Sequence, residues 1–179
     1  MEDEFSALPQ PQTRYRLGVL VTDHDPVPPF TQAGGYFSAY YDLFTAACST
    51  LWPYNQMEEL YDIYAYDVVS ENRSYPASSD VDAILITGSS ASAYDDEPWI
   101  IQLVEYVRFM YFSPLSESFG ILGSCFGHQI IARALGYVVA PNPNGWETGV
   151  ETVQLTPMGR QVLGLHELVR ILPHLTSYC

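Results

Sequence analysis

Residues 119–136 read FGILGSCFGHQIIARALG, and this stretch decides the fold. The apolar run at its start predicts a short buried strand, and the apolar residues spaced by three and four at its end predict a helix. Cys125 falls at the switch, with a glycine two positions away on each side. A strand, a tight glycine-flanked turn and a helix together indicate a nucleophile elbow.

The two glycines and the helix start give Cys125 its expected chemistry. A side chain at Gly123 or Gly127 would collide with neighbouring backbone in so sharp a turn. At a helix N-terminus the dipole and the N–H groups lower the pKa of a thiol and favour the reactive thiolate. Cys48 and Cys179 have no such context, and we expect them to behave as small apolar residues.

The composition predicts a globular chain without nucleic-acid or membrane partners. The 179 residues are 47% hydrophobic and 16% charged, with a formal net charge of −14. This charge argues against binding to nucleic acid or to anionic membrane surfaces. The chain has no secretory signal, no membrane-spanning run and an odd number of cysteines, so we expect a cytoplasmic location.

The hydrophobic pattern predicts an α/β fold. Residues 1–14 are predicted to be a disordered tail, and residues 15–179 a single domain. Continuous apolar strands alternate with helices, which predicts a mostly parallel sheet with helices on both faces. The predicted strands are 16–22, 60–69, 81–87, 119–122, 137–139, 150–155 and 168–172. The predicted helices are 36–51, 97–111, 126–136 and 156–163. In such a sheet ligands bind at the carboxyl ends of the strands, where His24, Gly88, Cys125 and residues 142–147 fall.

Several motifs resemble one family. Residues 120–129 (GILGSCFGHQ) closely resemble the nucleophile motif of class I glutamine amidotransferases, and 86–89 (ITGS) resemble their oxyanion strand. Residues 34–36 (GGY), 41–44 (YDLF) and 145–149 (GWETG) are similar to a stand-alone subgroup that includes plant gamma-glutamyl peptidases and fungal proteins. The resemblance runs from about residue 15 to about residue 170, and it implies a three-layer, flavodoxin-like fold.

The resemblance also implies roles for individual residues. Cys125 matches the nucleophile that attacks a glutamine side-chain amide, or a gamma-glutamyl bond, to form a thioester. The backbone N–H groups of Gly88 and Phe126 match the oxyanion-hole donors. His128, within the helix, is expected to be a packed histidine and not the base. The predicted substrate-binding residues are Gln129, Ser89, Glu147 and Trp146.

The family's general base does not appear in this sequence. It is a His with a Glu two residues on, in a His-Pro-Glu-like motif downstream of the elbow. Residues 173–179 instead read PHLTSYC, so we expect the domain to be incomplete at its C-terminus and its turnover to be impaired. The surrogate bases within the chain are His24 and His174, with His166 a weaker candidate. No cofactor or metal is expected, because the histidines are scattered and lack ligand spacing.

Two alternatives from other classes stay open. The G-x-C-x-G pattern also fits an α/β-hydrolase, although Gly127-His128-Gln129 favours the amidotransferase interpretation. In the second alternative, the chain is a non-catalytic paralogue that binds a small metabolite or a protein. The expected partners are glutamine or a gamma-glutamyl small molecule, with a synthase subunit or self-association through the apolar residues 171–178.

Overall fold

The computed structural model describes residues 14–24, 34–50, 61–113, 119–141 and 149–172. The chain divides into two compact units, residues 1–139 and 140–179, and each is described by itself. Apart from residue 14, the predicted disordered tail lies outside the described residues. Within the described part of the chain, no helix combines the length and the apolar character that spanning a bilayer requires.

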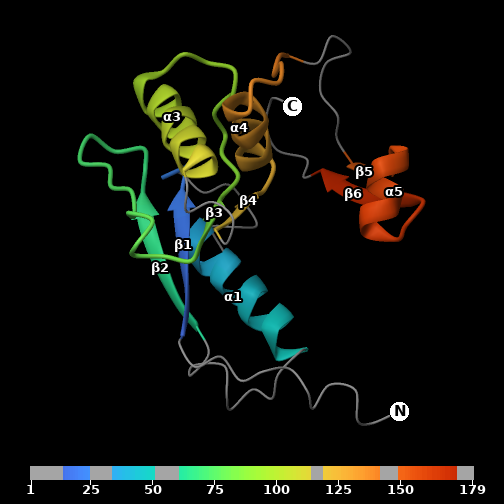
Figure 1. Cartoon of the computed structure of the whole chain (residues 1–179), viewed down its shortest axis with the longest axis horizontal. Helices are drawn as coiled ribbons and strands as arrows, with labels where there is room; N and C mark the ends of the chain where they lie inside the picture. The colour runs from blue at the N-terminus through green and yellow to red at the C-terminus, as the bar shows by residue number, and fades with distance from the viewer. Residues whose placement is uncertain (1–13, 25–33, 51–60, 114–118, 142–148, 173–179) are drawn as a thin grey trace. The chain divides into compact units, whose positions relative to one another are not determined.

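The first unit is built around a parallel sheet, as the sequence predicts (Figure 1). Its four strands lie in the order β2-β1-β3-β4, and each neighbouring pair is parallel. The order places β1 and β3 at the centre, where the longest apolar runs of the sequence fall. The strands are β1 (Tyr15–Val21), β2 (Tyr61–Asp67), β3 (Ala83–Ile86) and β4 (Gly120–Gly123), and the helices are α1 (Tyr36–Ser49), α3 (Pro98–Phe112) and α4 (Phe126–Ala134).

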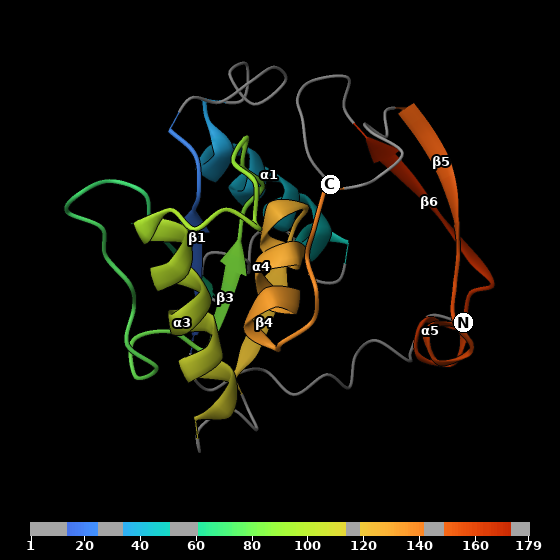
Figure 2. The ribbon, with the colours of Figure 1, turned by 90° about the horizontal axis from the view of Figure 1, so that it is seen from above.

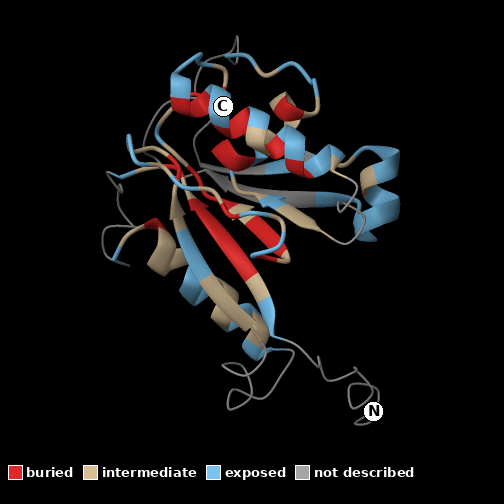
Figure 3. Ribbon diagram, turned by 60° about the vertical axis from the view of Figure 1, so that its left-hand side comes forward, coloured by how far each residue is buried: buried red, intermediate tan, exposed pale blue. Residues whose placement is uncertain are grey.

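The two faces of this sheet are covered by different helices (Figure 2). Successive strand residues point to opposite faces, so each central strand contributes to two cores. Leu20, Ile84 and Ile86 pack with residues of α3 and α4, whereas Leu17 and Val19 pack with residues of α1. Figure 3 shows the buried residues concentrated on the central strands and on α3 and α4, whereas α1 has one buried residue, Tyr36. The first unit is therefore a three-layer α/β arrangement.

The end of α4 corrects one predicted strand. Tyr137 N–H donates to Ala132 O at 3.0 Å and Gly136 N–H donates to Arg133 O at 3.1 Å. With Gly136 at φ 86°, these two bonds form a Schellman motif, which turns the chain away from the helix. The predicted strand 137–139 is wrong: Tyr137 is 69% exposed and these residues pair with no described strand.

An ion pair joins the starts of β1 and β3. The Arg16 side chain donates from Nε to Asp82 Oδ2 (3.2 Å) and from one terminal nitrogen to Oδ1 (2.9 Å). The backbone N–H of Arg16 also donates to Asp82 Oδ2, at 2.7 Å. These hydrogen bonds, those from the side chain foremost, hold the pKa of Asp82 below its ordinary value.

The second unit is a two-stranded antiparallel ribbon with one helix. The strands are β5 (Gly149–Gln154) and β6 (Glu167–Leu172), and α5 (Pro157–Leu163) lies between them in sequence. Thr156 caps α5 by accepting a hydrogen bond from Gly159 N–H at 3.1 Å, and Gly164 ends it in the left-handed conformation. The alternation of residues 150–155 predicted an edge or antiparallel strand, and the pairing of β5 with β6 is antiparallel.

We expect Asp82→Asn to lower the free energy of unfolding near pH 7 by about 1 kcal/mol. The effect is modest because Arg16 and Asp82 are 36% and 34% exposed, so solvent screens the pair. The folded carboxyl holds its proton more weakly than the unfolded one, so its stabilisation is complete above pH 4 to 5, roughly, and is lost as pH falls through the folded pKa. Urea unfolding at pH 7 and pH 3 should show the difference shrinking at pH 3. Asp42→Asn, at an exposed position of α1, is the control, and an equal loss at both pH values would contradict the prediction.

Candidate active site

The turn that carries Cys125 has the backbone geometry of a nucleophile elbow. Cys125 is the N-cap residue of α4, at φ 51° and ψ −105°, and it is exposed. Among the described residues it is the one non-glycine with a positive φ, a backbone conformation that residues with a side chain rarely adopt. The turn is closed by Gly127 N–H donating to Ser124 O at 2.8 Å. The sequence-based expectation of an exposed thiol at a helix N-terminus is confirmed.

The flanking glycines are required by close backbone approaches. A Cβ atom on Gly127 would lie 2.4 Å from the carbonyl oxygen of Ile86, at the end of β3. A Cβ atom on Gly123 would lie 2.4 Å from the carbonyl carbon of Gly127. Both distances are far shorter than a van der Waals contact, and the atoms that would be struck are backbone. Only glycine at both positions lets α4 start directly over the end of β3.

Gly88, the predicted oxyanion donor, is buried and lies beside Cys125. A Cβ atom on Gly88 would lie 3.8 Å from Cys125 Cβ and 3.9 Å from Tyr40 Oη. The backbone N–H of Gly88 donates to that Tyr40 hydroxyl at 3.3 Å. The strand end after β3 therefore presents an amide hydrogen close to the base of the Cys125 side chain.

A pair of buried threonines fixes the Gly88 peptide. Thr22 N–H donates to Thr87 Oγ1 at 3.1 Å, and the two hydroxyl oxygens are 2.8 Å apart. The Thr22 hydroxyl in turn donates to Gly88 O at 2.8 Å. Both threonine residues are buried, so these bonds are made without competition from water. The ends of β1 and β3 thus hold the Gly88 backbone in one orientation.

Tyr36 belongs to the same cluster. It is the first residue of α1 and only 5% exposed. Burial is the main reason why the pKa of Tyr36 is raised to about 12. Repulsion from the negatively charged forms of Asp23, Tyr40 and Cys125 adds to the effect. Tyr36 is therefore within electrostatic range of Asp23, Tyr40 and Cys125. Tyr36 is the last residue of the 34–36 (GGY) motif.

This geometry can be compared with known proteins. No family model matches the chain. A glutamine amidotransferase-like protein of Schizosaccharomyces pombe is 33% identical over 153 residues, which cover 84% of this chain and 59% of that protein. Gamma-glutamyl peptidase 4 of Arabidopsis thaliana is 36% identical over 76 residues, which cover 41% of this chain and 29% of the peptidase.

The chain is a homologue of glutamine amidotransferase-like proteins. The resemblance found in the motifs is thereby confirmed. The chain spans less than two thirds of the length of the curated relatives it matches, 59% and 60% of the two with the longest matches. A solved glutamine amidotransferase from Thermotoga maritima superposes with a TM-score of 0.59 at 15% identity, over 90% of this chain and 61% of that one. This last likeness confirms the predicted flavodoxin-like fold and no more than the fold.

His24, a predicted surrogate base, pairs with another part of the sheet. Its Nε2 lies 2.9 Å from Asp67 Oδ1, at the end of β2. Burial acts to raise the pKa of Asp67, but hydrogen bonds from Ser70, Val69 and His24 outweigh it and hold that pKa well below its ordinary range. In the sheet, β1 and β3 lie between β2 and β4, so the partner of His24 is on the far side from Cys125.

The other predicted site residues are distributed as follows. Gln129 is half-buried in the first turn of α4, where its N–H donates to Cys125 O at 3.2 Å. The Ser89 hydroxyl accepts a hydrogen bond from Ala91 N–H at 3.1 Å, which shapes the loop after Gly88. Phe126 is buried and stacks on Trp99, and its backbone N–H is the first of α4. Glu147, Trp146 and His174 lie outside the described residues.

Sequence reasoning missed Tyr40, Thr22 and Thr87 as parts of the site. Tyr40 falls within the predicted helix 36–51, four residues after Tyr36 and therefore on the same helix face. Thr22 and Thr87 each follow directly after an apolar strand, at the edge where ligands bind. A polar residue at that position of two adjacent strands was the available signal.

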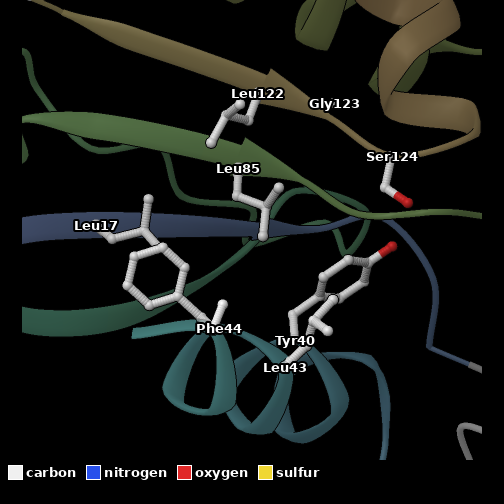
Figure 4. Close-up of a pocket in the computed structure, with 9 residues that line it drawn as sticks. Leu17, Tyr40, Leu43, Phe44, Leu85, Leu122, Gly123 and Ser124 are labelled. Carbon is white, nitrogen blue, oxygen red and sulfur yellow. The ribbon is translucent and has the colours of Figure 1, made fainter. Parts of the chain in front are cut away.

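An apolar groove runs from this site along α1 (Figure 4). It has a volume of about 370 Å³ and lies on the face of the sheet that α1 covers in part. Leu122 of β4, 54% exposed, is on this face. Ser124 and the Tyr40 hydroxyl lie at the end of the groove toward the elbow. The lining residues are Leu17, Tyr40, Leu43, Phe44, Ala47, Leu85, Leu122, Gly123 and Ser124.

We expect Gly127→Ala to lower the free energy of unfolding by about 3 kcal/mol or more, because the added methyl group would press on the Ile86 backbone. Gly136→Ala is the matched control. Gly136 also has a positive φ, but a Cβ there would meet nothing within 4 Å, so only the strain of the left-handed conformation remains, about 1 kcal/mol. Urea unfolding of both variants measures the difference. Equal losses of unfolding free energy in the two variants would contradict the prediction, because they would show that the close approach of α4 to β3 has room for a methyl group at residue 127.

Proposed function

We propose that this chain forms a thioester on Cys125 by attacking the side-chain amide of glutamine or a gamma-glutamyl bond. The observation that carries the proposal is the exposed Cys125 thiol on a strained elbow, with the buried Gly88 amide beside it. The start of α4 favours the thiolate, which is the attacking form. The names of the homologues, which include gamma-glutamyl peptidases, support the same class of substrate.

The proposed reaction has two halves. In the first, the sulfur bonds to the carbonyl carbon and the carbonyl electrons move onto oxygen, where the N–H groups of Gly88 and Phe126 stabilise the charge. The C–N bond then breaks, and the amine or ammonia leaves with a proton taken from water. In the second half, water attacks the thioester and releases the free carboxylate and the thiol. This half needs a general base.

We propose that the second half, the hydrolysis of the thioester, is slow in this chain. No His-Pro-Glu-like stretch follows the elbow in the 179 residues. His24 and His174 remain candidate surrogate bases in the proposal, but the contact of His24 with Asp67 supports a structural role for it. We place the chain in a reducing compartment such as the cytoplasm, where a free thiol persists. Glutamine, a gamma-glutamyl compound and a synthase subunit are the proposed partners.

We expect a glutamine-analogue electrophile, 6-diazo-5-oxo-norleucine, to label the wild-type chain at Cys125, because the elbow presents that sulfur. Peptide mapping by mass spectrometry locates the adduct. Cys125→Ala should abolish labelling, while Cys48→Ala, which removes a half-buried thiol of α1, should leave it unchanged. Unlabelled Cys125 in the folded wild-type chain would contradict the proposal and favour a non-catalytic, metabolite-binding paralogue.

We also expect acylation without rapid turnover. A gamma-glutamyl p-nitroanilide should release about one equivalent of p-nitroaniline in a burst, followed by a rate at least about 10²-fold slower, because general base catalysis contributes that much or more. His24→Ala should leave both phases unchanged, since its partner is Asp67. If the rate of the slow phase instead falls to background in His24→Ala, His24 would be the surrogate base.

A further inference from the structure

The hydrogen bond between Gly88 and Tyr40 places a side-chain hydroxyl at the proposed oxyanion site. The Gly88 N–H donates to Tyr40 Oη at 3.3 Å. In acyl transfer, the atom that accepts from such an N–H is the oxygen of the substrate carbonyl. The Tyr40 oxygen therefore stands next to, or in, the position that this carbonyl oxygen takes.

Three groups converge at this point from three elements. A Cβ atom on Gly88 would be 3.8 Å from Cys125 Cβ and 3.9 Å from Tyr40 Oη. Gly88 follows β3, Cys125 follows β4, and Tyr40 comes from α1. In Figure 4 the Tyr40 ring rises from α1 and carries its hydroxyl toward the end of the sheet where Ser124 lies. A carbonyl group attacked by Cys125 would be within reach of both Gly88 and Tyr40.

The helix that carries Tyr40 is anchored on both sides of it. Phe37 and Phe44 pack against the core of β1 and β3, and the Phe44 ring meets Tyr61 edge-on at 5.3 Å between centroids. The backbone at Tyr40 is therefore held, and the ring moves only by rotation about its own side-chain bonds. A small rotation shifts the hydroxyl off the Gly88 N–H but keeps it at the same site.

We propose that Tyr40 is a third oxyanion donor, whose hydroxyl donates a hydrogen bond to the substrate carbonyl oxygen as Cys125 attacks. A phenol can both accept and donate, so Tyr40 accepts from Gly88 before substrate binds and donates to the substrate oxygen once that oxygen is bound to Gly88. The donor is neutral and releases no proton in this step. The inference rests on the proposed function of Cys125 and adds a catalytic residue to it.

The opposite role for Tyr40 predicts the opposite effect. If its hydroxyl only blocked the Gly88 N–H, the substrate would have to displace it, and removing the hydroxyl would speed acylation. If it donates to the developing oxyanion, removing it slows acylation. The sign of the effect of Tyr40→Phe therefore separates the two roles.

The test uses p-nitrophenyl acetate, which acylates a thiolate without needing gamma-glutamyl recognition or protonation of the leaving group. The rate constant of the p-nitrophenol burst is measured for the wild type, Tyr40→Phe and Tyr41→Phe. Tyr41 is the control, since it is on the same helix and 42% exposed. Loss of one oxyanion donor costs about 10²- to 10³-fold in other enzymes, and with the two backbone donors retained we expect a loss of at least about 10-fold in Tyr40→Phe and none in Tyr41→Phe.

A second probe separates catalysis from effects on the thiol or the fold. Iodoacetamide alkylates sulfur by displacement at a tetrahedral carbon, so no oxyanion forms. We expect Tyr40→Phe to change the alkylation rate of Cys125 by less than about twofold, and its urea midpoint to match that of Tyr41→Phe. Equal losses in acylation and alkylation, an unchanged burst rate or a faster burst would each overturn the inference.

The same experiment keeps the two proposals apart. A Tyr40-dependent burst that requires Cys125, in a chain that the glutamine analogue does not label, would support the role of Tyr40 and contradict the gamma-glutamyl substrate. If the wild-type chain shows no burst that depends on Cys125, both proposals would be overturned.

Discussion

The close approach of α4 to β3 is the constraint on which the described site depends. At Gly127 the helix backbone comes so near to the Ile86 carbonyl that no side chain fits between them. This contact fixes where the helix begins, and the start of the helix forces Cys125 into its positive φ. The strain at Cys125 is thus held in place by packing around it, and its consequence is a sulfur that stands clear of the sheet.

The same sheet edge also holds the groups that would act on a carbonyl. Thr22 and Thr87 tie the ends of β1 and β3 together and fix the Gly88 peptide, so the amide hydrogen is oriented before any ligand arrives. Preorganised donors of this kind cost nothing to align when charge develops, which is why they are effective in acyl transfer. Backbone and buried hydroxyls, not charged side chains, make up this part of the site.

The sequence allowed the fold and the elbow to be predicted because both depend on local patterns. The glycine pair around Cys125 is such a pattern, and so are the apolar runs of the parallel strands. The rest depends on how the chain is placed in three dimensions. The apolar run at 137–139 looks like a strand, but Gly136 turns it into solvent after the helix. His24 looks well placed in sequence, yet its carboxylate partner is at the end of β2. The sequence did not identify Tyr40 as a site residue, because a tyrosine among the apolar residues of a helix is expected to pack in the core.

The described residues bring together groups that suit the first half of the proposed acyl transfer. An exposed thiol, a fixed amide hydrogen and a nearby phenol would serve the formation of a thioester, and they come from β3, β4 and α1 of the first unit. Hydrolysis of that thioester needs a base positioned on a water molecule, and His24, which follows β1, is engaged with Asp67. Under the proposed function, the rates of acylation and of hydrolysis at Cys125, more than the presence of the cysteine, decide whether such a chain acts as an enzyme or as a covalent trap for its substrate.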